Sequence, residues 1–253
     1  MPEPVVDAPR PSQARTADFV DGLGPTLVVA PHPDDESIGC GGLIALLCER
    51  GVPVSVILLS DGSGSHPNSR RFAPAARSAL RLGEMRQALE RLGVAAPLIA
   101  LGWPDGALPR SGEPGFAAAA AVVEQQLRTL APATVLAPWR RDPHRDHRAA
   151  SEIVRAARRA CRAAGQTPPR LLEYGVWLAE RAGEGDWPHP GETRRWPVDI
   201  GAVLARKQAA IAAHASQQGV VIDDDPDGFV LPASLLARAG ARREHYDECV
   251  HDD

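Results

Sequence analysis

Along the chain, short apolar runs alternate with longer stretches in which the apolar residues have helical spacing. The apolar runs predict buried strands over residues 26–31, 52–60, 97–101 and 134–138. The stretches between and after them predict amphipathic helices over residues 38–50, 77–92, 115–130 and 146–164. Strands that alternate with helices in this way form a parallel sheet with helices packed on both faces. We therefore expect an α/β protein with a Rossmann-like, mostly parallel sheet in three layers, α/β/α.

After about residue 168 the alternation becomes less regular. Residues 171–178 and 196–200 predict further strands, and residues 201–214 and 232–241 predict helices. The length of 253 residues suits one α/β domain, which we place over residues 23–253. Residues 1–22 begin with a proline-rich, polar stretch and are expected to be a disordered or loosely ordered tail. The part from about 168 to 253 is expected to complete the substrate site.

Composition argues against several partners and locations. The net charge of −4 predicts no surface for nucleic acid or anionic membranes. No stretch reaches the ~18 apolar residues of a membrane span, and the first residues lack the apolar core of a secretory signal. The four cysteines form no CxxC pair, which favours a reducing compartment. We expect a cytoplasmic protein, and association into a homo-oligomer is compatible with such a domain.

Polar and aromatic residues follow each of the first four predicted strands. They occupy residues 32–36, 61–74, 103–114 and 139–147. In open α/β sheets, ligands bind beyond the carboxyl ends of the strands. The pattern therefore predicts that these four loops meet at one edge of the sheet and form the functional site.

The first loop places one imidazole and three carboxylates directly after an apolar strand, as His32, Asp34, Asp35 and Glu36. Charged groups removed from water must be paired or must bind a cation. His32 and Asp35 lie three residues apart across a strand-to-helix turn, so both can face one metal ion. Asp34 then points elsewhere and is placed to take a proton from an attacking water. Capping of the following helix is the alternative, but it does not explain His32.

The fourth loop carries two further histidines, His144 and His147, on either side of Asp146. Catalytic zinc takes three protein ligands and keeps one position open, and His147 completes such a set with His32 and Asp35. We expect His144 to face the substrate as an acid or as a stabiliser of the oxyanion. Asp146 is placed to hold His144 in one tautomer. The alternative is that this segment is only a polar loop in solvent. This alternative is the weaker one because the acidic first loop supplies the other residues of a metal site.

Taken together, these segments resemble the PIG-L/LmbE-like family of zinc-dependent N-deacetylases. The resemblance covers about residues 26–217, and the paired histidine motifs are its specific part. It is carried by APHPDDESIGCGG at 30–42, SDG at 60–62, RLGEMRQALERLGV at 81–94, LGWPDG at 101–106, DPHRDH at 142–147 and KQAAIAAHASQ at 207–217.

The resemblance implies a Rossmann-like fold and one zinc ion per chain, with other divalent ions such as Fe²⁺ as an option. It implies that His32, Asp35 and His147 bind the ion. It further implies that Asp34 is the general base and that His144 stabilises the tetrahedral intermediate.

The resemblance also implies that Arg81 reaches into the site and contacts substrate. From the residues alone, an i,i+3 ion pair between Arg81 and Glu84 on an exposed helix face is the alternative. Trp103 and Trp139 lie in the site loops and are candidates for stacking on a sugar ring, although tryptophan more often packs in the core. Some family members carry a tyrosine where this chain has Asp142, so a phenol has no role here at that position.

The function predicted is zinc-dependent hydrolysis of an N-acetyl group from an amino sugar, a small-molecule glycoside such as an N-acetylglucosamine conjugate. A metal-dependent amidase or esterase acting on a non-sugar acyl group is the alternative enzyme. A non-catalytic carbohydrate-binding relative is a third hypothesis, but binding alone requires neither Asp34 nor His144.

Three further features have interpretations of their own. Residues 62–74 are interpreted as a lid or as an idle insertion. Residues 223–225 are interpreted as a solvated turn, and His214 as a surface or capping residue.

Overall fold

The computed structural model describes residues 13–250, with side chains from Thr16 onward. Its centre is a seven-stranded sheet in the order β3-β2-β1-β4-β5-β7-β6. Strands β1 to β5 pair in parallel, and β7 runs antiparallel to both of its neighbours. The predicted mostly parallel α/β sheet is therefore confirmed. The strands are β1 Thr26–Ala30, β2 Val54–Ser60, β3 Ile99–Trp103, β4 Thr134–Pro138, β5 Arg170–Tyr174, β6 Thr193–Asp199 and β7 Arg243–Cys249.

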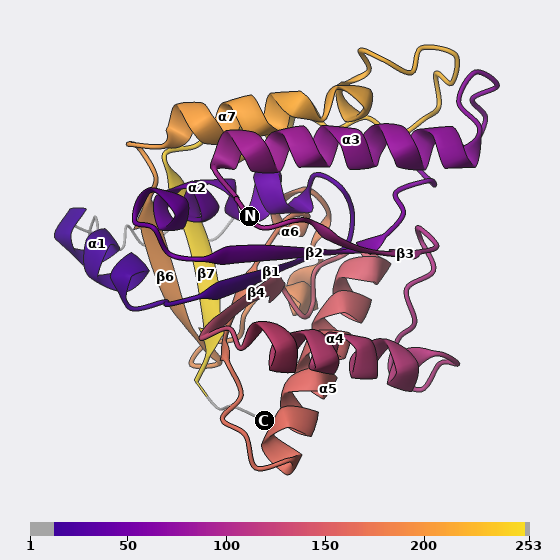
Figure 1. Ribbon diagram of the computed structural model, residues 1–253. Coiled ribbons are helices and arrows are strands. Elements are labelled where there is room, and N and C mark those ends of the chain that lie inside the picture. The colour runs from indigo at the N-terminus through magenta and orange to yellow at the C-terminus, as the bar shows by residue number, and fades with distance from the viewer. Residues whose placement is uncertain (1–12, 251–253) are drawn as a thin grey trace.

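Helices cover both faces of the sheet (Figure 1). The helices α2, α3 and α7 pack together on one face, and α4 packs against α5 on the other. The α-helices are α1 Gln13–Asp21, α2 Asp35–Glu49, α3 Pro74–Leu92, α4 Phe116–Leu130, α5 Arg145–Ala163, α6 Leu178–Arg181, α7 Leu204–Ala213 and α8 Ala233–Ala239. Two short 3-10 helices, η1 Glu184–Asp186 and η2 Ala215–Gln218, complete the set.

The side chains of β1 divide the core into two halves. Val28 and Ala30 belong to the apolar cluster on the α2–α3 face, whereas Leu27 and Val29 belong to the cluster beneath α4 and α5. All four side chains are fully buried. A strand covered on both faces appears in the sequence as a continuous apolar run rather than as an alternating one. This is why β1 could be predicted.

Among the elements that were not predicted, α1 and β7 are the longest. Strand β7 is rich in charged residues and lacks an apolar run, but its charges are paired: Glu244 contacts Lys207 Nζ at 2.7 Å, and Asp247 contacts Arg195 at 2.8 Å. In α1, Val20 is fully buried. The expectation of a tail is therefore wrong for residues 13–22, while residues 1–12 lie outside the described residues.

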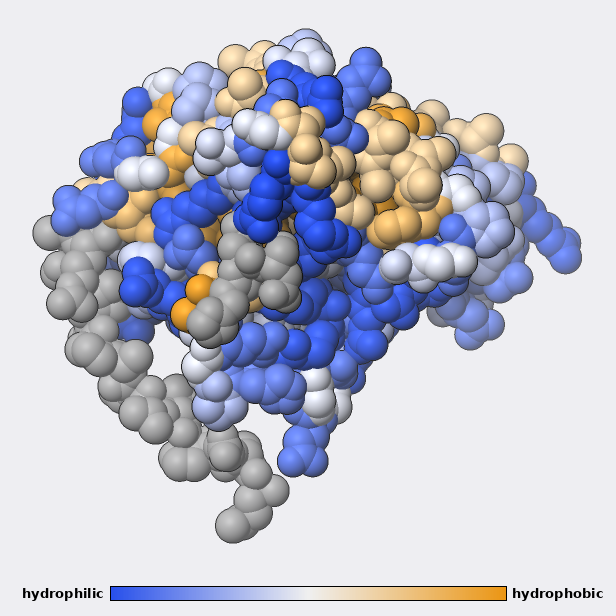
Figure 2. Space-filling view, turned by 90° about the horizontal axis from the view of Figure 1, so that it is seen from below, coloured by the Kyte–Doolittle hydropathy of each residue, from blue (hydrophilic) through white to orange (hydrophobic). Residues whose placement is uncertain are grey.

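The surface on the α4–α5 side is mostly hydrophilic, with apolar surface gathered in one part (Figure 2). Within residues 13–250, no helix is long and apolar enough to cross a membrane.

Candidate active site

The site lies where β1 and β4 run side by side at the centre of the sheet. The chain leaves β1 toward β2 on one side and leaves β4 toward β5 on the other, so a crevice opens beyond their carboxyl ends. His32 follows β1 by two residues, and His147 lies in the first turn of α5 after β4. The topology thus brings together two motifs that are more than a hundred residues apart in the sequence.

Three side chains converge on one point in this crevice. The Asp35 Oδ2 atom lies 3.2 Å from His32 Nδ1 and 3.2 Å from His147 Nε2. It also accepts a hydrogen bond from the backbone N–H of His32 at 2.9 Å. Asp35 and His147 are almost completely buried, with exposed fractions of 2% and 0%. The structure therefore brings together the three predicted metal ligands.

The remaining nitrogen of each histidine faces a carboxylate. His32 Nε2 lies 3.2 Å from Asp105 Oδ1 and 3.2 Å from Asp146 Oδ2. His147 Nδ1 lies 3.3 Å from Asp142 Oδ1. Carboxylates in this position orient metal-binding imidazoles and make them more basic. Burial lowers the pKa of His147, but Asp35 and Asp142 outweigh it and raise that pKa to about 9.

These observations fit a divalent cation. Neither ring nitrogen of the fully buried His147 makes a well-formed hydrogen bond within the described chain, and both are close to carboxylate oxygens. Two imidazoles and one carboxylate are a donor set that suits Zn²⁺ or Fe²⁺. A nitrogen of His144 also lies within 4.8 Å of nitrogens of His32 and His147. We place Asp35 ahead of His144 as the third ligand, because its oxygen is close to both of the other two residues.

Asp34 adopts a strained backbone conformation at the start of α2, with φ 130° and ψ −28°. For a residue other than glycine such strain costs roughly 1–3 kcal/mol. The Asp34 N–H donates to Glu36 Oε2 at 3.2 Å, which helps to hold this conformation. Burial raises the pKa of the Asp34 carboxyl to about 7, although Arg81 acts in the opposite direction.

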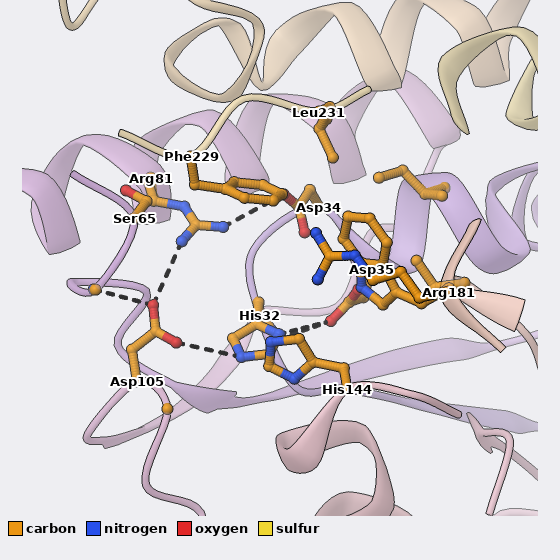
Figure 3. Close-up of a pocket in the computed structure, with 15 residues that line it drawn as sticks. His32, Asp34, Asp35, Ser65, Arg81, Asp105, His144, Arg181, Phe229 and Leu231 are labelled. Carbon is orange, nitrogen blue, oxygen red and sulfur yellow. Dashed lines mark hydrogen bonds and ion pairs between the residues drawn. The ribbon is translucent and has the colours of Figure 1, made fainter. Parts of the chain in front are cut away.

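Arg81 reaches the site, as the family resemblance implied (Figure 3). Its guanidinium contacts Asp34 Oδ2 at 3.3 Å and donates to the carbonyl oxygens of Pro33 and Gly62 at 2.8 and 2.9 Å. The alternative of an ion pair with Glu84 is wrong. Arg81 is buried, and Glu84 instead accepts hydrogen bonds from the backbone and hydroxyl of Ser216.

His144 faces the cavity, but Asp146 does not hold it as predicted. The Asp146 carboxylate contacts His32 and accepts backbone hydrogen bonds from Gly106 and Leu108. It is the backbone N–H of Asp146 that donates to His144 Nδ1, at 3.2 Å. The reason is that His144 is the residue that caps α5, so its ring folds back onto the first turn. Asp146 therefore positions His32 by its side chain and His144 by its backbone.

The two tryptophans expected to contact substrate do not line the cavity. Trp139 is 1% exposed, and its indole N–H donates to the carbonyl oxygen of Asp186 at 2.7 Å. Trp103 packs on the apolar cluster beneath α4 and α5. The two predictions failed for different reasons: Trp103 packs into the core beside its strand, whereas Trp139 is held by η1 and by the guanidinium groups of Arg140 and Arg141, each 4.8 Å from the centre of its ring.

The cavity itself has a volume of about 290 Å³ and two unlike walls. The polar wall consists of His32, Asp34, Asp35, Arg81, Asp105 and His144. The opposite wall is mostly apolar and comes mostly from the C-terminal part of the chain, which contributes Arg181, Phe229 and Leu231 in Figure 3. This second wall consists of Ile38, Val176, Trp177, Arg181, Phe229 and Leu231.

Several functional residues were missed or misjudged in the sequence. Asp105 and Asp142 lie in predicted site loops, so their positions were a usable signal. His214 is the C-terminal cap residue of α7, which agrees with the capping interpretation, but it is 1% exposed rather than a surface residue, and its Nε2 lies 3.1 Å from Glu36 Oε1. Trp177 gave no signal, because nothing local distinguishes it from a core tryptophan.

The acidic run at residues 223–225 is not a solvated turn. Asp224 accepts hydrogen bonds from the backbone of Arg70 and Arg71, both at 2.9 Å, and Asp225 accepts one from the backbone of Asn68, also at 2.9 Å. The two aspartates therefore anchor the 62–74 loop. That loop is not an idle insertion, since Gly64 and Ser65 line the cavity.

Comparisons with known proteins agree with this geometry. Residues 27–158 match the model of the family described as PIG-L, GlcNAc-PI de-N-acetylase. A 1D-myo-inositol 2-acetamido-2-deoxy-alpha-D-glucopyranoside deacetylase of Nocardia farcinica is 31% identical, over 88% of this chain and 89% of that protein. A diacetylchitobiose deacetylase of Thermococcus kodakarensis is 30% identical, over 76% of this chain and 69% of that protein. The crystal structure of a conserved protein from Thermus thermophilus superposes with a TM-score of 0.63 at 28% identity, over 89% of this chain and 94% of that chain.

Proposed function

The chain belongs to the PIG-L family of de-N-acetylases, and from that premise we propose that it hydrolyses the N-acetyl group of an amino sugar joined to a further group. The observation that carries this proposal is the convergence of Asp35 Oδ2 with His32 Nδ1 and His147 Nε2 at 3.2 Å. Asp34 and His144 line the same cavity. Relatives named as deacetylases of an acetamido-glucopyranoside and of diacetylchitobiose support the substrate class.

We propose that His32, Asp35 and His147 hold one zinc ion per chain. Two nitrogen donors and one carboxylate are typical of catalytic zinc, and Fe²⁺ is the alternative that the same set accepts. When bound, such an ion polarises a carbonyl group and lowers the pKa of water toward about 7.

Asp34 is the residue that takes the proton of the attacking water. Arg81 contacts its Oδ2 atom only, and within the described chain Oδ1 accepts no hydrogen bond. That oxygen is therefore available to a water molecule in the cavity. The protonated Asp34 then returns this proton to the nitrogen of the leaving amine, so that the carboxylate is regenerated.

His144 acts as a hydrogen-bond donor to the oxygen on which charge develops. Its Nδ1 atom accepts the backbone hydrogen bond of Asp146, so the proton of the neutral ring is on Nε2. A donor held in place before the reaction stabilises the tetrahedral intermediate without reorganisation. Burial lowers the pKa of His144 to about 4.

The test is release of free amine from a panel of N-acetylated sugars by the zinc-loaded protein. The panel holds N-acetylglucosamine, its inositol and malate conjugates, diacetylchitobiose and an N-acylated glycopeptide. We expect amine release by the wild type, and a loss of about 10²–10⁴-fold in kcat for Asp34→Ala with the metal content unchanged. Loss of metal from Asp34→Ala would show that Asp34 is a ligand. Equal activity of the two proteins would overturn the mechanism.

A further inference from the structure

The cavity contains two arginines, and only one of them is neutralised by the protein. Arg81 contacts the carboxylates of Asp34 and Asp105 at 3.3 and 3.6 Å. Among the residues that the structure describes, no carboxylate lies within ion-pair distance of the Arg181 guanidinium, and no oxygen accepts a hydrogen bond from that group. The backbone N–H of Arg181 donates to the carbonyl oxygen of Trp177 at 2.9 Å. Figure 3 shows the Arg181 side chain pointing into the cavity. Its charge is therefore available to a ligand.

Arg181 is held in place by an aromatic stack. Its guanidinium carbon lies 3.9 Å from the centre of the Trp177 ring, and Trp177 is 4% exposed. Trp177 in turn meets Phe229 edge to face, with ring centres 5.9 Å apart. A stacked guanidinium keeps its in-plane N–H donors free, and their fork matches a carboxylate or phosphate group. The stack thus prepares Arg181 for an anion rather than burying its charge.

One buried carboxylate links this stack to the metal-binding residues. Asp142 Oδ1 lies 3.3 Å from His147 Nδ1, while Oδ2 accepts the backbone N–H groups of Val176 and Trp177 at 3.1 and 3.0 Å. Asp142 is fully buried. The position of Trp177, and through it that of Arg181, is therefore set relative to the reacting centre and not by a free loop.

Backbone hydrogen bonds also hold the apolar residues of this wall in place. The Phe229 N–H donates to the carbonyl oxygen of Ser65 at 2.7 Å, and the Leu231 N–H donates to that of Gln217 at 2.8 Å. Leu231 and Val176 are buried, and Phe229 is half-buried. A ligand that meets Arg181 with a negative charge also meets carbon surface on the adjoining atoms.

We propose that Trp177, Arg181 and Phe229 form a subsite for an anionic substituent, a carboxylate or a phosphate, on the aglycone of the substrate. The aglycone lies against the apolar wall, and its charged group pairs with the edge of the Arg181 guanidinium. This inference rests on the proposed function only in placing the acetamide group over His32, Asp35 and His147.

The test uses three N-acetylglucosaminides that differ only in the aglycone: propyl, 2-carboxyethyl and 2-phosphonoethyl. For the zinc-loaded wild type, we expect kcat/KM to be about tenfold higher with an anionic aglycone than with propyl. The Arg181→Gln variant should bring that ratio close to one, and Arg181→Lys should keep part of it. Arg159→Gln, an exposed arginine on α5, is the matched control and should keep the full ratio. The larger of the two anionic ratios identifies carboxylate or phosphate as the natural group.

Failure of the subsite can be separated from failure of the deacetylase proposal. Turnover of all three compounds with the same ratio in wild type and Arg181→Gln would overturn the subsite alone. If none is turned over, binding of the same compounds is measured by calorimetry in Asp34→Asn with and without Arg181→Gln. Anion binding that depends on Arg181 would then support the subsite and contradict the deacetylase proposal. No difference in binding would overturn the subsite as well.

Discussion

The two walls of the cavity come from different parts of the chain and differ in their electrostatics. The polar wall consists of residues between His32 and His144, all inside the 27–158 segment that matches the family model, and its charges are paired within 3.6 Å of one another. The apolar wall comes mostly from residues between Val176 and Leu231, outside that segment, and its one charge, on Arg181, has no carboxylate partner in the described chain. The comparison teaches that the groups we propose for the reaction and those we propose for substrate choice come from separate parts of the chain. A change in the second wall leaves the charge balance of the first intact.

The largest effect is expected from removing a metal ligand that lies behind the polar wall. His147→Ala removes the one nitrogen donor of the proposed set that is fully buried. We expect loss of the bound metal and of detectable amine release, because two remaining ligands do not hold a catalytic zinc ion. Metal content per chain, measured by plasma mass spectrometry together with amine release, checks this. His189→Ala, which changes an exposed histidine, is the control. Retention of one metal ion per chain by His147→Ala would exclude it as a ligand.

A smaller but broader effect is expected from Asp142, which touches both walls. Asp142→Asn keeps the shape of the side chain and removes the charge beside His147 Nδ1. We expect metal affinity to fall by about 10–100-fold, since carboxylates behind ligand histidines typically contribute this much. Zinc competition against a chelating dye measures it. Unchanged zinc affinity would mean that the contact between Asp142 and His147 is incidental.

A change confined to the apolar wall is expected to affect binding and not chemistry. Phe229→Ala removes a half-buried ring that meets Trp177. We expect KM to rise by about fivefold with kcat and metal content unchanged, because the lost contact is equal in the ground state and the transition state. Steady-state kinetics with a substrate that the wild type hydrolyses separate the change in KM from any change in kcat. The neighbouring Val230→Ala, at a position 45% exposed, should leave KM as it is. A fall in kcat alone would place Phe229 in the reaction.

The smallest effect is expected from the anchor of the 62–74 loop. Asp224→Ala removes the acceptor of the Arg70 and Arg71 backbone N–H groups. We expect faster hydrogen exchange at these two amides, with kcat/KM changed by no more than about twofold. Hydrogen exchange at the amides of the 62–74 loop is measured by mass spectrometry. Asp223→Ala, which removes only a side-chain contact with Arg71, should leave exchange at both amides unchanged. Unchanged exchange in Asp224→Ala would show that other contacts hold the loop.

Prediction from the sequence succeeded where the determinants are local. The apolar run before His32 predicted β1, and the change from an apolar run to charged residues predicted the edge where the site lies. The helical spacing after His147 predicted α5 within one residue at each end. Strand β7 was missed because its charges are stabilised by partners such as Lys207, which is distant in sequence.

Within the site, the sequence by itself determined which residue types are available for chemistry: His32, Asp34, Asp35, His144 and His147, at strand ends that a parallel sheet must bring to one edge. Only the tertiary structure decided how each group is oriented. It directed the Asp146 carboxylate to His32, buried Trp139, and linked Asp142 to both His147 and Trp177. The physical reason is that a strand end fixes a residue's location through local backbone preferences. The direction of a side chain depends on partners from other elements, such as His32 for Asp146, 114 residues away, and Asp186 for Trp139, 47 residues away.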